Sequence, residues 1–483
     1  MFVGRENEIK ILENINSSNQ AQFVAIYGRR RIGKTYLVET FFKNRSQKKF
    51  HITGEKNGDK RRQLEIFRIE IENIFYNRSR IPDLTSWNEA FNLLIACLKS
   101  LPSQASLKSI LIFLDELPWL AVERSGLLEA LDHAWNTELR KIPFVRLVIC
   151  GSSASWIIKK IVQNKGGLHN RLTEQIHLKP FTLQETKKYL HAQGIQHGQN
   201  QIIELYMALG GIPYYLSLVQ KGESVVQTIS RLCFGGSLTQ EFNLLFDALF
   251  DNAGQHKKIV SAITNSRKGI SRAELLKKLK LTAGGRLTEW LDELLYAGFI
   301  AKIPPIYSKG KEIKYRVIDP FCLFHLKWIK SAPSGVFQPN ENYWNSIKSS
   351  PSYAAWSGYA FENLCYMHVE DIKKFLGIES IQVQIGNWSF IEKNRMNEKG
   401  AEIDLVFDRE DDVVSLCEIK FYDKKIIFSK ELSEKINYKR KIFIEKTGTK
   451  KTVLNVLICK NGTKENEYTK RTLQNIICVE DFF

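Results

Sequence analysis

The chain has 483 residues, of which 43% are hydrophobic, and its formal net charge is +18. This length leaves room for about three or four domains, and no apolar stretch is long enough to cross a bilayer, which excludes a membrane-spanning protein. Residues 1–6 lack the basic segment and apolar core of a secretory leader, so we predict a cytoplasmic protein. The eight cysteines form no C-x-x-C pair, so no zinc or redox motif is expected. The positive charge favours a polyanionic partner.

A phosphate-binding motif follows the first predicted strand. Residues 22–27 are apolar and β-rich, and Gly28–Thr35 read G-x-x-x-x-G-K-T before a segment that can continue as a helix. A strand, a glycine loop and a helix in this order place backbone N–H groups around a polyphosphate. We therefore predict an ATP site in which Lys34 reaches the β- and γ-phosphates and Thr35 ligates Mg²⁺. The remaining cradle residues are Gly28, Arg29, Arg30, Arg31, Ile32 and Gly33.

Two further predicted strands end in polar residues that would complete an ATPase site. Residues 109–114 are apolar and lead into Asp115 and Glu116. Since parallel strands present ligands at their carboxyl ends, Asp115 is expected to hold Mg²⁺ through water, and Glu116 to orient or deprotonate the attacking water. Residues 144–150 form a third strand before Ser152. Two interpretations of Ser152 stay open: its hydroxyl contacts the γ-phosphate or the lytic water, or it caps the following helix.

The segment after residue 181 changes to a helical composition. Thr182 and Glu185 form a capping box, and Gly210–Pro213 interrupts the helices. This composition suits a helical lid over a nucleotide pocket.

A winged-helix domain is predicted next. An amphipathic helix over 256–263, a capping box at Ser271, a helix over 286–296 and two strand-like pieces follow one another, with a basic loop over 308–311. One interpretation places the 286–296 helix in a DNA groove, and the other gives the domain a packing role. That helix carries three acidic residues against one arginine, which favours packing. The acidic residues are Glu289, Asp292 and Glu293, and the arginine is Arg286.

A second chemical pattern lies near the carboxyl end. Asp404 begins one predicted strand and Glu418 and Lys420 end the next, so an antiparallel hairpin would bring them together. Two carboxylates can hold Mg²⁺ or Mn²⁺, which activates water, and the lysine can stabilise charge on a phosphodiester. Glu362, in a helical stretch upstream, is a candidate extra metal ligand or water-binder. The lysine-rich segment 424–441 suits a phosphate backbone. The alternative is a solvated hairpin whose charges face water.

These motifs resemble the archaeal-type ATPases, a prokaryotic AAA-related P-loop group, over almost the whole chain. The segments that carry the resemblance are 2–6, 27–35, 114–119, 150–156, 168–172 and 210–216. The resemblance implies that Val3 and Gly4 lie near the adenine. It also implies that Arg171 approaches the γ-phosphate, in cis or from a neighbouring copy, which would make a homo-oligomer. A surface salt bridge is the alternative role of Arg171.

Many members of this family end in a restriction-endonuclease-like PD-(D/E)xK domain. Residues 358–362, Asp404 and Glu418–Lys420 are similar to its motifs. The residue before Asp404 is Ile403, whereas the name of the motif has proline there, and this replacement does not by itself imply loss of activity.

Together these features predict an α/β protein with four domains. A P-loop ATPase domain is expected over 1–180, a helical lid over 181–250, a winged-helix domain over 251–330 and a nuclease-like domain over 331–483. One functional hypothesis is an ATP-dependent enzyme that acts on DNA with a metal-dependent nuclease-like domain. The other is a nucleotide-controlled switch whose end domain only binds nucleic acid or a protein partner.

Overall fold

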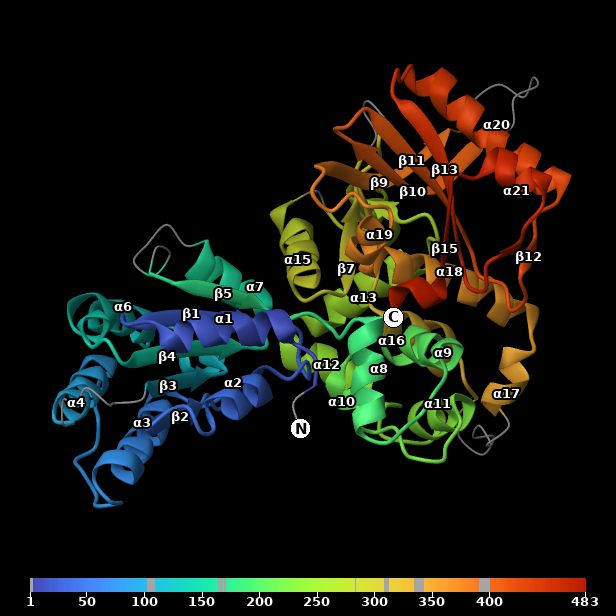
Figure 1. The fold of residues 1–483 in the computed structure, drawn as a ribbon. Helices are drawn as coiled ribbons and strands as arrows, with labels where there is room; N and C mark the ends of the chain where they lie inside the picture. The colour runs from blue at the N-terminus through green and yellow to red at the C-terminus, as the bar shows by residue number, and fades with distance from the viewer. Residues whose placement is uncertain are drawn as a thin grey trace. The chain divides into compact units, whose positions relative to one another are not determined.

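The computed structural model describes residues 3–101, 109–163, 168, 171–282, 284–307, 312–333, 343–390 and 400–483. The chain divides into two compact units, Met1–Pro180 and Phe181–Phe483, which are coloured blue to green and green to red in Figure 1. Within the described ranges, no helix combines the length and the apolarity needed to cross a bilayer.

The first unit is built on a parallel five-stranded sheet in the order β2-β3-β4-β1-β5. Its strands are β1 (Gln22–Tyr27), β2 (Lys48–Thr53), β3 (Ile110–Asp115), β4 (Val145–Gly151) and β5 (Glu174–His177). Every residue of β3 and β4 is buried, as expected for strands that helices cover on both faces. The carboxyl ends of β1, β3 and β4 therefore meet at one edge of the sheet.

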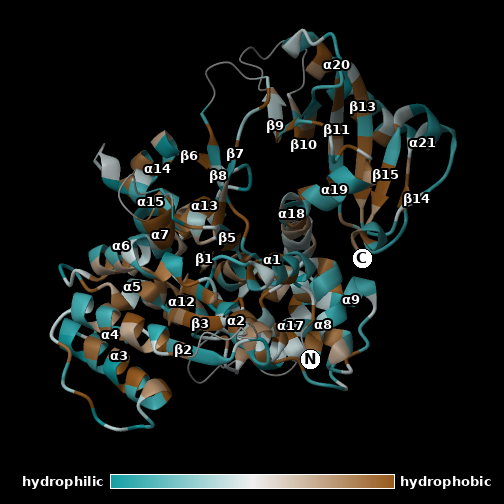
Figure 2. Ribbon diagram, turned by 60° about the vertical axis from the view of Figure 1, so that its left-hand side comes forward, coloured by the Kyte–Doolittle hydropathy of each residue, from teal (hydrophilic) through white to brown (hydrophobic). Residues whose placement is uncertain are grey.

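Helices pack on both faces of this sheet. One face packs against α1 (Glu6–Ser17) and α2 (Lys34–Phe42), through side chains such as Leu12 and Phe42. The other face packs against α3 (Lys60–Phe75), α4 (Trp87–Lys99) and α6 (Leu127–Thr137). Two short helices, α5 (Leu117–Leu120) and α7 (Ala154–Ile157), follow β3 and β4. Strands β1, β3 and β4 are mostly hydrophobic, whereas β2 and β5 include polar residues. The helices carry both polar and apolar residues, as Figure 2 shows.

The second unit begins with helices. They are α8 (Leu183–Ala192), α9 (Gln199–Leu209), α10 (Pro213–Leu216), α11 (Val225–Phe234) and α12 (Glu241–Leu249). The predicted capping box is present: the Thr182 hydroxyl accepts from the Glu185 N–H, and the Glu185 carboxylate accepts from the Thr182 N–H. The role of this region as a lid stays a prediction.

Three helices and a small sheet follow. They are α13 (Ala253–Thr264), β6 (Ile270–Ser271), α14 (Arg272–Leu279), α15 (Gly285–Tyr296), β7 (Ile300–Ile303) and β8 (Lys314–Val317). The sheet is antiparallel in the order β6-β8-β7, so it has one strand more than the sequence predicted. Strand β6 is two residues long and runs directly into the Ser271 cap, which leaves no alternating pattern to recognise. The basic loop 308–311 lies outside the described residues.

The end of the chain forms a mixed five-stranded sheet in the order β15-β13-β11-β10-β9. Its strands are β9 (Val383–Phe390), β10 (Ala401–Arg409), β11 (Val413–Lys420), β13 (Thr452–Cys459) and β15 (Asn475–Cys478). Strands β9, β10 and β11 are antiparallel neighbours, whereas β11, β13 and β15 are parallel. A separate pair joins β12 (Ile426–Ile427) to β14 (Thr463–Lys464).

Among the residues described, six α-helices belong to this region, and α18 and α20 pack on the mixed sheet. They are α16 (Pro320–Phe324), α17 (Tyr343–Lys348), α18 (Pro351–Met367), α19 (Val369–Phe375), α20 (Lys430–Thr447) and α21 (Glu467–Thr472). Helix α18 packs with Leu405 and Cys417 on one face, and α20 packs with Val406 and Leu416 on the other. One hydrophobic core runs from Phe181 to Phe482, across both of the boundaries predicted inside this unit.

Candidate functional site

The predicted phosphate loop joins the end of β1 to the start of α2. Gly28 and Gly33 have backbone φ angles of 152° and 92°, which residues with a Cβ rarely adopt. A Cβ at Gly28 would also lie 2.3 Å from the carbonyl oxygen of Leu178. Glycine is therefore required at Gly28 both by the backbone angle and by the space.

Lys34 lies over its own loop. Its Nζ donates hydrogen bonds to the carbonyl oxygens of Gly28, at 3.0 Å, and Arg29, at 3.1 Å, and the side chain is buried. The ammonium group is thus fixed at the loop that the sequence assigns to the phosphates. Arg30, Arg31 and Ile32 continue this loop, where Arg31 has a φ of 70°.

The predicted magnesium ligands Thr35 and Asp115 contact each other directly. The Thr35 hydroxyl donates to Asp115 Oδ2 at 2.7 Å, and Asp115 Oδ1 accepts from the backbone N–H of Glu116 at 2.9 Å. A hydroxyl and a carboxylate oxygen are the hard donors that Mg²⁺ prefers, so this pair fits the ion.

Glu116 is held by Ser152. Glu116 Oε2 accepts from both the backbone N–H and the hydroxyl of Ser152, each at 2.9 Å. Glu116 has a φ of 47°, and this left-handed conformation opens the short helix α5. The helix-cap interpretation of Ser152 is not what the structure has, because Ser153 occupies the N-cap position of α7. Ser152 instead fixes the carboxylate that is expected to act on water.

Arg5 is a buried residue to which the sequence assigned no role. Its guanidinium donates to the carbonyl oxygens of Lys179, at 2.6 Å, and Ile32, at 3.3 Å. This contact ties the segment that begins with Val3 and Gly4 to the phosphate loop. Arg5 lies in segment 2–6, which carries part of the family resemblance, but a single sequence gives no sign that such a side chain is buried. Arg171 is exposed, and its predicted approach to the γ-phosphate stays a prediction.

The second predicted site lies where β10 and β11 pair as an antiparallel hairpin. Asp404 Oδ2 accepts from the backbone N–H of Ile419 at 3.0 Å, and Lys420 Nζ lies 2.7 Å from Glu418 Oε1. A shift of register in the pairing of β10 with β9 falls between Ile403 and Val406, beside Asp404. The structure therefore brings Asp404, Glu418 and Lys420 together at the end of the hairpin.

Two other cations join this cluster, and the sequence predicted neither contact. Lys439 of α20 donates to Glu418 Oε2 at 2.5 Å. Arg316 of β8 donates to Glu362 Oε2 at 2.7 Å. Glu362 is therefore paired with a guanidinium group, and in this arrangement it does not share a metal position with the other two carboxylates. Arg316 also lies over the rings of Tyr359, at 4.4 Å, and Tyr366, at 5.3 Å. The Tyr366 hydroxyl donates to the carbonyl oxygen of Asp404 at 2.5 Å.

These contacts separate the pKa values of the two central carboxyl groups. Burial, together with the negative charges of Glu418 and Glu362, raises the pKa of Asp404 to about 7. Burial alone would raise the pKa of Glu418 as well, but Lys420 and Lys439 outweigh it and hold that pKa below its usual value. The pKa of Lys420 is raised because its attraction to Glu418 exceeds the effect of its burial.

Within the part of the chain that the structure describes, no group of three or more His, Cys, Asp or Glu side chains is arranged to hold a metal ion. The two carboxylates Asp404 and Glu418 remain the donors to which a divalent cation at this end would bind, since both are oxygen ligands. Glu362 could join them only by leaving Arg316.

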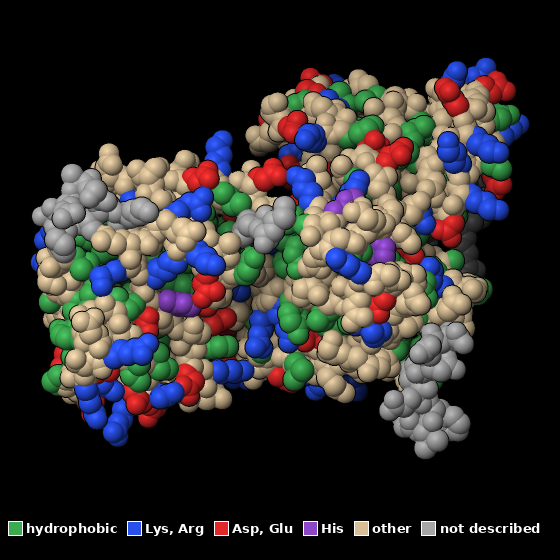
Figure 3. Space-filling model, turned by 60° about the horizontal axis from the view of Figure 1, so that its bottom comes forward, with side chains coloured by type: hydrophobic (Ala, Val, Ile, Leu, Met, Phe, Trp, Pro, Cys, Tyr) green, Lys and Arg blue, Asp and Glu red, His purple; other side chains and the backbone are tan. Residues whose placement is uncertain are grey.

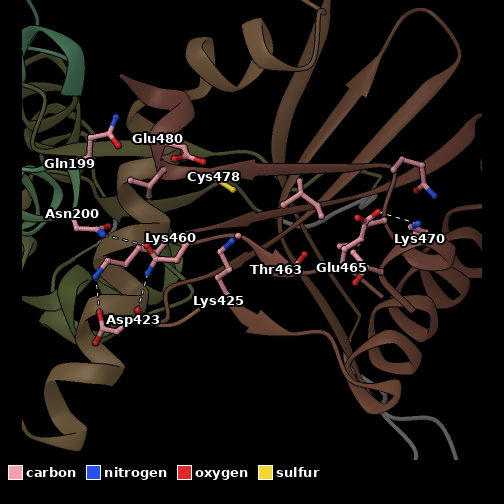
Figure 4. A pocket seen from close by; sticks show the side chains of 17 residues that line it. Gln199, Asn200, Asp423, Lys425, Lys460, Thr463, Glu465, Lys470, Cys478 and Glu480 are labelled. Carbon is pink, nitrogen blue, oxygen red and sulfur yellow. Dashed lines mark hydrogen bonds and ion pairs between the residues drawn. The ribbon is translucent and has the colours of Figure 1, made fainter. Parts of the chain in front are cut away.

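A cavity of about 910 Å³ lies elsewhere in the second unit (Figure 4). It is lined by residues near the carboxyl ends of β13 and β15 and by the start of α9. Lys460 pairs with Asp423 at 2.7 Å, Lys470 pairs with Glu465 at 3.4 Å, and the amide of Asn200 contacts Asn461. Most of its charges are therefore satisfied within the protein. Lys425 of segment 424–441 lines this cavity, and none of the predicted catalytic or metal-binding residues does.

The first part of the chain is similar to a known family. Residues 2–219 match the model of a family described as an ATPase domain predominantly from Archaea. An uncharacterized protein of Methanocaldococcus jannaschii is 27% identical over 435 residues, which are 88% of each chain. An uncharacterized ATP-binding protein of the same organism is 42% identical over 52 residues, or 11% of this chain and 88% of that one.

Two solved structures have a similar course of the chain. A Walker-type ATPase of Pyrococcus abyssi is 18% identical, with 68% of this chain and 96% of the other covered and a TM-score of 0.48. The ORC2 protein of Aeropyrum pernix is 13% identical, with 71% and 94% covered and a TM-score of 0.41.

Proposed function

We propose that this protein, which carries an archaeal-type ATPase domain over residues 2–219, uses ATP to control a metal-dependent, nuclease-like end domain that acts on DNA. The observation that carries the proposal is the convergence of Asp404, Glu418 and Lys420 at the end of the β10–β11 hairpin. Two carboxylates beside an ammonium group are the set of groups needed to hydrolyse a phosphodiester with the help of a divalent cation.

The residues of the ATPase domain have separate roles. Lys34 places a positive charge at the β- and γ-phosphates, and Thr35 and Asp115 hold Mg²⁺, which when bound neutralises the charge that develops on the phosphates. Glu116 orients the attacking water, and Ser152 keeps the Glu116 carboxylate in one position through two hydrogen bonds.

In the end domain, Asp404 and Glu418 supply oxygen ligands to Mg²⁺ or Mn²⁺, which when bound polarises the scissile phosphate and activates water. Lys420 faces the same point and stabilises the negative charge that grows on the phosphate. Glu362 serves as an extra ligand or water-binder only after it separates from Arg316, since their present contact is 2.7 Å.

DNA contact is expected from local groups of lysines. The lysines of segment 424–441 lie on and before α20, and one of them, Lys439, contacts Glu418. On the face drawn in Figure 3, Lys and Arg side chains are interspersed with Asp and Glu, so that face does not form one basic field. We assign a winged-helix fold and a packing role to residues 253–317. Glu293 of the acidic helix α15 contacts His256 at 2.7 Å, and Asp292 of the same helix contacts Lys302 at 3.5 Å.

One observation favours the alternative of a nucleotide-controlled switch. Each carboxylate oxygen of Glu418 is contacted by a lysine ammonium group, so a metal ion would have to compete with two positive charges for this carboxylate. In that alternative the end domain binds nucleic acid or a protein partner and cleaves nothing.

The deciding experiment incubates the full chain with plasmid DNA, linear DNA and RNA, with Mg²⁺ or Mn²⁺, and with and without ATP. We expect metal-dependent cleavage that Asp404→Ala abolishes while ATP hydrolysis persists. If no substrate is cleaved with either metal although ATP is hydrolysed, the switch is the correct description.

A further inference from the structure

Glu418 is bound by two lysines from different elements. Lys420, two residues along the same strand, lies 2.7 Å from Oε1, and Lys439 of helix α20 lies 2.5 Å from Oε2. The Glu418 side chain is 6% exposed and that of Lys439 is 16% exposed, so both charges are largely removed from water. Burying such charges is costly unless they are paired, and the pair is therefore a built feature of the site.

Packing fixes Lys439 at this position. Ile442 and Phe443, about one turn further along α20, are buried against Val406 and Leu416 of the sheet. Ile436, one turn before, is buried against Leu457 of β13. Because residues three and four positions apart share one face of a helix, Lys439 is on the face that meets the sheet. Lys435, on the same helix, is exposed and pairs with no described residue.

The cluster contains three acidic and three basic side chains. Its three carboxylates belong to Glu362, Asp404 and Glu418, and its three cations are Arg316, Lys420 and Lys439. A divalent cation that binds Glu418 would meet the ammonium of Lys439 at the same oxygen, and like charges at such a distance repel. Lys439 then has to move to another anion, and the phosphodiester of the substrate is the anion that arrives at this point.

We propose that Lys439 is a second lysine of the nuclease-like site, which holds Glu418 as a counter-ion until a divalent cation displaces it and then binds the substrate phosphate. This rests on the proposed function, because it takes Glu418 to be a metal ligand. The divalent cation and the DNA would then bind cooperatively. The cation replaces Lys439 at Glu418, and the DNA phosphate accepts the released ammonium group. Such coupling between two ligands is reciprocal.

The test measures Mn²⁺ affinity by titration calorimetry and by electron paramagnetic resonance, on the full chain, with and without a short DNA duplex. Without DNA, Lys439→Met should bind Mn²⁺ about fivefold or more tightly than wild type, because the competing charge is gone. With DNA, wild type should gain Mn²⁺ affinity and Lys439→Met should gain much less. Lys435→Met removes the same charge from the same helix and should leave the Mn²⁺ affinity without DNA unchanged.

Lys439→Gln serves as a second replacement, and the thermal unfolding of each variant identifies one that has not folded. If wild type binds Mn²⁺ and neither folded variant binds it more tightly, Lys439 is not a competitor and the inference is wrong. If wild type and both variants bind no Mn²⁺ at millimolar concentration, the metal site itself is wrong and the proposed function is overturned together with the inference.

Discussion

The acidic groups of the ATP site in the first unit and the Glu418 and Glu362 carboxylates of the second unit are held by different means. Asp115 and Glu116 are held by hydroxyl and backbone N–H donors, which come from Thr35, Ser152 and the chain itself. Glu418 and Glu362 are held by lysine and arginine side chains. A neutral donor leaves the charge of a carboxylate available to a metal ion, whereas a cation already balances it. The comparison teaches that Mg²⁺ at the proposed first site would displace no cation, whereas a divalent cation at Glu418 would have to displace a lysine.

The largest expected effect is on the rate of ATP hydrolysis when Glu116, the residue proposed to orient water, is replaced. Glu116→Gln keeps an oxygen that can accept from Ser152 but loses the charge and the basicity of the carboxylate. We expect ATP hydrolysis to fall about 10²–10⁴-fold with nucleotide binding retained. Steady-state hydrolysis and the anisotropy of a fluorescent ATP analogue measure the two quantities. Lys34→Ala is the contrasting variant and should lose tight binding as well. A Glu116→Gln protein that hydrolyses ATP at the wild-type rate would remove Glu116 from this role.

The next largest effect is on DNA cleavage, and it distinguishes the proposed metal ligand Asp404 from the proposed phosphate-binding cation Lys420. Lys420→Ala should lower DNA cleavage about 10²–10³-fold and keep metal binding, because an ammonium group stabilises the phosphate charge and ligates nothing. Asp404→Ala should lose metal binding and cleavage together. Mn²⁺ titration and a plasmid-nicking assay provide the readings. ATP hydrolysis, measured in parallel, is the control and should be unaffected in both variants. Loss of Mn²⁺ binding in a folded Lys420→Ala protein would contradict the assignment.

A smaller loss of ATP hydrolysis is expected when one of the neutral donors of the first site is removed. Ser152→Ala removes the hydroxyl bond to Glu116 but keeps the bond from the backbone N–H. A hydrogen bond to a charged group is worth roughly 1.5 kcal/mol or more, so the rate of ATP hydrolysis should fall about tenfold. Ser153→Ala, at the neighbouring hydroxyl, is the matched control and should hydrolyse ATP like wild type. Equal rates for the two variants would show that the Ser152 hydroxyl does not position Glu116.

The smallest effect is a pH dependence of stability in the second unit. The pKa of Asp404 is raised to about 7, so between about pH 4 and this value the native state binds more protons than the unfolded state. The free energy of unfolding should therefore fall as the pH rises through this window. Asp404→Asn stays neutral, so its melting temperature should exceed that of wild type at pH 8 by a few degrees and match it near pH 4. Melting curves without metal test this, and a gap that does not change with pH would contradict it.

Much of both sites could be predicted because the information is local in the sequence. Strand β1 spans the residues 22–27 that its apolar run indicated, and the polar residues after β3 lie at the loop as their position required. The spacing of Glu418 and Lys420 was enough to place both on one face of a strand. Asp404 could be assigned to them because a short acidic turn joins the two strands.

What could not be predicted are contacts between elements that lie far apart in the chain. Helix α20 carries several lysines, and only the packing of Ile442 and Phe443 selects Lys439 among them. Arg316 looked like an ordinary strand residue, and nothing nearby in the sequence announces Glu362, 46 positions later, as its partner. Ser152 had two plausible partners at the end of β4, and its actual partner, Glu116, comes from the neighbouring strand's end.

The position of Arg316 also limits how this chain can be divided or recombined. A fragment that begins at residue 331 would leave its guanidinium behind, and with it the charge that balances Glu362 and the group packed between Tyr359 and Tyr366. Pro304 is lost in the same cut, although its carbonyl oxygen lies so near Gly386 that a Cβ there would be 2.1 Å away. Residues 331–483 are therefore not expected to fold when they are transferred alone to another protein. A fusion that contains them without strand β8 should misfold.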